Sequence, residues 1–101
     1  MSEPLVLSGQ PGTITVAAVA LDRVVVHAAE SVEGAQVRRP KRSVDVAHRA
    51  GRASVSFELA IEQGVPVPEL ARTVQERVAD AVAATSGLDV ERVEVTVAEI
   101  A

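Results

Sequence analysis

The segment from Ser54 to Glu62 alternates between apolar and polar positions, and this pattern limits the possible folds more than any other feature. Its apolar positions are Val55, Phe57, Leu59 and Ile61. Successive side chains of a strand point to opposite faces, so this strand buries one face and exposes the other. Such a strand is typical of an antiparallel sheet covered by a second layer on one side.

Two longer segments have the three- and four-residue spacing of amphipathic helices. The first is expected at about residues 16–32, and Gly34 follows it as a candidate left-handed cap. The second begins near Pro68, which is tolerated in a first helical turn, and ends near Ser86, before Gly87. The two apolar stripes comprise Leu21, Val24, Val25, Ala28, Ala29 and Val32, and Leu70, Ala71, Val74, Val78, Ala81, Val82 and Thr85.

Shorter strands complete the pattern. A terminal strand is indicated by Val93, Val95 and Val97, another strand is expected at 35–39, and residues 12–15 fit either a strand or the lead-in to the first helix. The order (β)αββαβ predicts an α+β fold, a two-layer sandwich with two helices packed on one face of a mostly antiparallel sheet of three to four strands. We expect residues 1–11 to form a flexible N-terminal tail and residues 12–101 to form a single domain.

The apolar part of the composition is almost entirely valine and alanine, with one phenylalanine and no tryptophan, tyrosine or cysteine. Without cysteine the chain has no disulfide, thiolate nucleophile or cysteine-based metal site. We find neither a signal peptide nor an apolar run long enough to span a bilayer. The expected location is the cytoplasm, with at most peripheral attachment to the membrane.

Charge is unevenly distributed along the chain. The net charge is −4, but residues 37–52 carry +5 and the remainder carries −9. We expect a basic loop at 38–52 and take its six cations as candidate partner-binding residues: Arg38, Arg39, Lys41, Arg42, Arg49 and Arg52. The competing interpretation is a solvated loop without a partner.

The basic loop supports two binding hypotheses. It could dock onto an acidic protein face, including the acidic remainder of a second copy in a head-to-tail contact. Alternatively, the chain is a small nucleic-acid-binding module that uses the six cations. Nucleic-acid grooves usually add aromatic stacking residues, and Phe57 is the only aromatic residue here.

No pattern of residues indicates catalysis. His27 and His48 lie in no close-spaced metal-ligand motif, and the acidic pairs Glu58/Glu62 and Glu91/Glu94 lie on positions expected to face solvent. The Gly9-Gln10-Pro11-Gly12 segment follows the expected tail and does not join two helices, as a nucleic-acid-clamping loop would. We therefore assign no catalytic, cofactor or metal residue, and no small-molecule substrate.

From Gly12 onward the sequence resembles the alkaline shock protein family, the Gls-type envelope stress response proteins. The first matching block is Gly12-Thr13-Ile14-Thr15-Val16-Ala17. A second runs from Phe57-Glu58-Leu59-Ala60-Ile61 through Val74-Gln75-Glu76-Arg77-Val78 to Val93-Glu94-Val95-Thr96-Val97. The sequence departs from the family pattern at four points: Gly34-Ala35 stands where Gly-Val is usual, Ser86 widens a Thr-Gly pair, Gln63 stands where an aromatic residue is common, and Glu94 stands where an asparagine is common.

The resemblance implies a non-enzymatic protein of cell-envelope stress and homeostasis in Gram-positive bacteria. It implies self-association into a homo-oligomer and attachment to the inner membrane face through a membrane-anchored partner. Assembly has a second candidate element in the last strand, because an unpaired valine-rich edge can add a further strand. Glu94 and Glu99 are candidate guards against uncontrolled pairing there.

Overall fold

The computed structural model describes Leu5–Leu7, Ile14–Val16 and residues 18–101. A short N-terminal hairpin is formed by β1 (Leu5–Leu7) and β2 (Ile14–Val16), which pair antiparallel. The other elements are α1 (Ala18–Glu30), β3 (Ala35–Arg38), β4 (Asp45–Arg49), β5 (Arg52–Ile61), α2 (Val67–Ser86) and β6 (Asp89–Ile100). Apart from β1, the expected tail at 1–11 lies outside the described residues.

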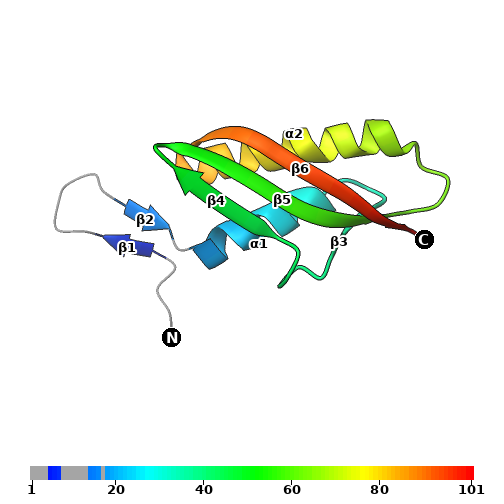
Figure 1. Ribbon diagram of the computed structural model, residues 1–101, viewed down its shortest axis with the longest axis horizontal. Coiled ribbons are helices and arrows are strands. Elements are labelled where there is room, and N and C mark those ends of the chain that lie inside the picture. The colour runs from blue at the N-terminus through cyan, green and yellow to red at the C-terminus, as the bar shows by residue number, and fades with distance from the viewer. Residues whose placement is uncertain (1–4, 8–13, 17) are drawn as a thin grey trace.

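The main sheet is built around β5, the strand with the strict alternation. β3 and β4 both pair antiparallel with β5, β3 along its C-terminal half and β4 along its N-terminal half. β6 pairs with β5 in the parallel direction, because α2 carries the chain back across the sheet before β6 begins. Both helices lie on the same side of this sheet (Figure 1). The α+β two-layer fold predicted from the sequence is confirmed, with β4 as an additional strand.

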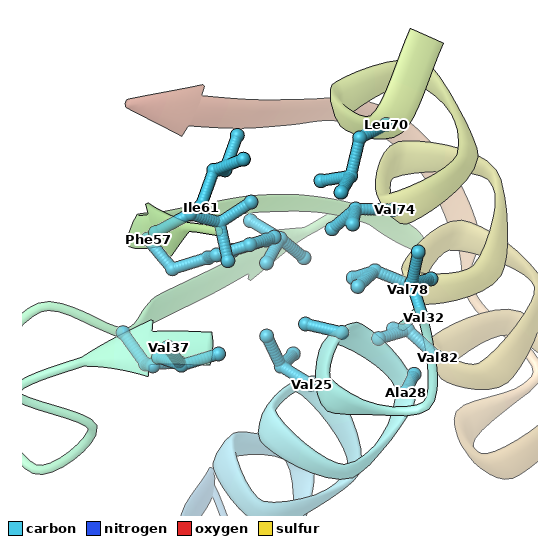
Figure 2. Close-up of a cluster of buried hydrophobic side chains, with 14 of the residues drawn as sticks. Val25, Ala28, Val32, Val37, Phe57, Ile61, Leu70, Val74, Val78 and Val82 are labelled. Atoms are coloured by element: carbon cyan, nitrogen blue, oxygen red, sulfur yellow. The ribbon is translucent and has the colours of Figure 1, made fainter. Parts of the chain in front are cut away.

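The core is a layer of valine, alanine and leucine around one aromatic ring. Phe57 is 2% exposed and Leu59 and Ile61 are fully buried, as the alternation of β5 requires. Figure 2 shows Phe57 and Ile61 facing the buried valines of both helices. Among the described residues no polar or charged side chain is buried. The helix layer is therefore held on the sheet by apolar contact.

The basic loop expected at 38–52 is only partly a loop. Residues 39–44 form a turn, Asp45–Arg49 form β4, and β5 begins at Arg52. Val44 is buried and Val46 is partly buried against the core, while the other residues of β4 are exposed. The strand was missed because an edge strand that exposes its charges has almost no apolar alternation.

Candidate partner-binding site

The cations at 39–42 form a first group, which we call the turn cluster: Arg39, Lys41 and Arg42. All three side chains are exposed on the turn between β3 and β4. The Arg39 carbonyl accepts hydrogen bonds from the backbone N–H groups of Arg42 and Ser43, both at 2.8 Å. Arg39 itself has a φ of 46°, in the left-handed region. The turn is thus closed by its own backbone, and its side chains are directed to solvent.

Arg49 and Arg52 form a second group, the hairpin cluster, at the other end of β4. They occupy directly opposite positions where β4 and β5 are joined by Ala50 and Gly51. Like charges in opposite positions of a strand pair repel each other. One ion pair relieves this repulsion, between Arg52 Nη1 and Glu91 Oε1 at 3.7 Å, but both side chains are more than half exposed. Such a pair contributes little to stability, so the hairpin cluster stays available to an anionic group.

Arg38 differs from the other five cations. Its Nε lies 3.4 Å from Glu99 Oε1, so the pair spans the open face of the sheet from β3 to β6. In the register Arg38 is opposite Glu58 of β5 and Glu99 is opposite Ala60, so the pair crosses β5 diagonally between these two positions. This ion pair places Arg38 on the open face of the sheet, apart from the turn cluster.

The six cations consequently do not form one continuous basic patch. The turn cluster and the hairpin cluster lie at opposite ends of β4 (Figure 1), and Arg38 is engaged by Glu99. Sequence proximity suggested a single loop because the strand that separates the two clusters was not recognised.

A groove next to the turn cluster was not anticipated from the sequence. It has a volume of about 410 Å³ and is lined by Asp22, Arg23 and Val26 of α1 and by Pro40 and Lys41 of the turn. Burial, and secondarily the negative charge of Asp45, raise the pKa of the Asp22 carboxyl above its usual value. The turn cluster therefore borders a surface that combines apolar area with charges of both signs.

The residues weighed for metal binding or catalysis remain apart. His27 is exposed on α1 and His48 is exposed on β4. Glu58 lies half-buried on the open face of the sheet, Glu62 is exposed beyond the end of β5, and Glu91 and Glu94 are exposed on β6. Within residues 18–101 and the two short N-terminal strands, no group of three histidine, aspartate or glutamate residues could hold a metal ion.

Comparison with known proteins identifies the family. The model of the alkaline shock protein 23 family, described by a cell envelope-related function, matches residues 7–101. The chain belongs to the alkaline shock protein 23 family. This match confirms the resemblance to alkaline shock proteins and connects the fold described above with the cell envelope. No curated protein matches the chain significantly.

Solved structures with a similar fold include several forms of MamM CTD. A MamM-CTD variant has a TM-score of 0.57 at 20% identity and covers 82% of this chain and 99% of that chain. A second variant has a TM-score of 0.56 at 21% identity and covers 80% and 93%. A cadmium form has a TM-score of 0.55 at 20% identity, with 79% and 94% covered. At these identities the likeness supports the two-layer fold only.

In the part of this alkaline shock protein that the structure describes, neither helix combines the length and the apolar character needed to cross a bilayer.

Proposed function

We propose that this alkaline shock protein is a non-enzymatic scaffold or adaptor of cell-envelope homeostasis that self-associates and docks onto a protein partner. In this proposal it acts in the cytoplasm and reaches the inner membrane face through a membrane-anchored partner. The observation that carries the proposal is the family match over residues 7–101, with its cell envelope-related function.

The interior of the domain supports a binding role. A catalytic site usually places titratable groups in a cleft that perturbs their pKa values. Here the buried side chains among the described residues are all apolar, and Asp22, whose pKa is raised, lies in a surface groove. The charged groups are thus displayed on the surface, where they are suited to recognise another macromolecule.

The turn cluster is the surface that we propose for the partner. Lys41 contributes to both the cluster and the adjacent groove, and Val26 and Pro40 supply apolar area within that groove. Protein interfaces commonly combine a desolvated apolar centre with a charged rim. A partner segment with an apolar side chain flanked by acidic residues would match both parts.

The chain's only aromatic residue bears on the nucleic-acid alternative. Phe57 is 2% exposed beneath the helices, so it offers no face on which a base could stack. The turn and hairpin clusters also lie at opposite ends of β4, which divides the positive charge. Both observations favour a protein partner over a nucleic acid.

A capture experiment with matched variants tests this proposal. The turn variant Arg39→Gln, Lys41→Gln and Arg42→Gln is compared with the hairpin variant Arg49→Gln and Arg52→Gln. We expect the wild type and the hairpin variant to retain the same membrane-anchored protein from cell extract, and the turn variant to lose it. Equal capture by all three proteins would contradict the assignment to the turn cluster.

A gel-shift series against salt distinguishes the nucleic-acid alternative. A nucleic-acid module would bind tightly at low salt, weaken steeply as salt rises, and lose binding in both variants. We expect no shift at low salt for any of the three proteins.

A further inference from the structure

The two edges of the main sheet differ in length and continuity. One edge is made of two short strands, β3 with 4 residues and β4 with 5, separated by the turn that contains Pro40. The other edge is β6, a strand of 12 residues that pairs with β5 and, among the described residues, with no other strand. A long open strand edge is a surface onto which a further strand can add.

The valines of β6 lack the cover that their neighbours on β5 have. Val93, Val95 and Val97 lie opposite Val55, Phe57 and Leu59, which are at most 2% exposed. The three valines are only partly buried. A strand placed beyond β6 would remove more of this apolar surface from water and stabilise the assembly.

The charges on β6 indicate which strand fits there. Register shifts against β5 interrupt β6 at Glu91 and at Ala98, so the regular stretch is 92–97. On its open face Arg92 and Glu94 flank Val93, and both side chains are exposed. In the described part of the chain neither of them forms an ion pair.

We propose that β6 of one copy pairs antiparallel with β6 of a second copy about a two-fold axis at Val93. In this register Arg92 of each copy lies opposite the partner's Glu94, which forms two ion pairs. This inference rests on the self-association proposed above and names its surface.

Neighbouring registers are less favourable for identifiable reasons. An axis at Glu94 would place two glutamates opposite each other, and like charges in that position repel. An axis at Val95 would leave Arg92 and Glu94 without opposite charges. A shift by one residue would turn the valines of one copy to the wrong face of the sheet. Among these registers the axis at Val93 is the one that places Arg92 opposite Glu94 while keeping Val93 opposite Val93; Val95 then lies opposite Glu91, where the irregularity of β6 ends the regular pairing.

The groove beside this edge is open to a second copy. It has a volume of about 330 Å³ and is lined by Gln75, Glu76 and Ala79 of α2 and by residues 90–93 of β6. The Gln75 Nε2 donates a hydrogen bond to the Val93 carbonyl at 3.0 Å, and a second strand that bonds to this carbonyl would replace or share that donor. Two-fold pairing extends the sheet and places the two α2 helices on the same face.

Charge-reversal variants test the proposed register by sedimentation equilibrium. Arg92→Glu alone would place two pairs of glutamates opposite each other, and Glu94→Arg alone would place two pairs of arginines opposite each other. Each is expected to raise the dimer Kd roughly 10- to 100-fold. The double variant R92E/E94R, and an equimolar mixture of the two single variants, are expected to dimerise nearly as tightly as the wild type, because unlike charges face each other again.

The controls separate this inference from self-association itself. Arg49→Glu makes the same change in net charge as Arg92→Glu, on β4 at the opposite edge of the main sheet, and is expected to leave the Kd unchanged. Circular dichroism confirms that each variant is folded. A wild type that associates, with single variants that associate equally well, overturns the β6 pairing but leaves the scaffold proposal standing. A wild type that stays monomeric at millimolar concentration overturns both.

Discussion

Gly34 provides the sharpest test of how the helix layer is packed onto the end of the sheet. It has a φ of +93°, and a Cβ atom added there would lie 3.3 Å from both Leu70 Cδ1 and Val65 Cγ2. Gly64 has nearly the same φ, +95°, but no heavy atom within 4 Å of an added Cβ. The two glycines thus share one backbone requirement and differ in their surroundings.

The expected magnitudes follow from this difference. Alanine in a left-handed conformation costs about 1–2 kcal/mol, and the lower entropy of the unfolded chain offsets about 0.4–1 kcal/mol of that cost. Gly64→Ala should therefore lower the free energy of unfolding by about 0.5–1 kcal/mol. Gly34→Ala adds crowding against two side chains, for which overpacking costs of about 1–3 kcal/mol are typical, giving about 1.5–4 kcal/mol in total.

Urea denaturation followed by circular dichroism measures both variants, and thermal melting gives an independent value. A gap of about 1 kcal/mol between them corresponds to about 4–8 °C in Tm for a domain of this size. If Gly34→Ala and Gly64→Ala lose the same stability, the contacts of Gly34 with Leu70 and Val65 do not restrict the site and the packing argument is refuted.

Two other substitutions give separate measurements. Ala50 and Gly51 have φ values of 53° and 79°, as in a type I′ turn, where asparagine is preferred at the first position. Ala50→Asn should therefore raise the free energy of unfolding, measured in urea, by about 0.5–1 kcal/mol, and an unchanged value would show that Ala50 is not strained. Asp22 binds its proton more tightly in the folded protein than in the unfolded chain because its pKa is raised, so its ionisation destabilises the fold as pH rises above the ordinary value of 3.8. Asp22→Asn should therefore raise Tm at neutral pH. The difference in Tm between this variant and the wild type should disappear below pH 3.8, where Asp22 is protonated in both the folded and the unfolded protein. A difference in Tm that does not change with pH would count against this explanation.

The helices and the central strand were predictable because their patterns report burial directly. The second helix was expected from Pro68 to Ser86 and is observed at Val67–Ser86, with Gly87 in the left-handed conformation as its cap. β5 was recognised because its inward positions are fully apolar and its outward positions are mostly polar. Each pattern arises because one face of the helix or strand is buried, so apolar residues recur along the sequence with the period of that element.

The basic segment shows where such reasoning fails. β4 lies at the edge of the sheet and contributes only Val46 to the margin of the core, so its sequence carries little periodicity. Positive charge that is continuous in the sequence is therefore divided in space by an unrecognised strand. The division between the partner surface that we propose at Arg39, Lys41 and Arg42 and the separately placed Arg38 depends on that strand and on the pairing of Arg38 with Glu99.

The last strand illustrates a second kind of limit, which is set by topology. Its valines identify it as a strand, but only the return of the chain through α2 decides that it lies parallel to β5 and at the edge of the sheet. The two glutamates considered as edge guards then acquire different roles. Glu99 is engaged by Arg38 across the sheet, whereas Glu94 stands two residues from Arg92 on an open edge. In the pairing that we propose, Glu94 would repel the Glu94 of a second copy when the axis lies at Glu94, and would attract its Arg92 when the axis lies at Val93. Glu94 can thus both exclude a wrong register and favour the correct one.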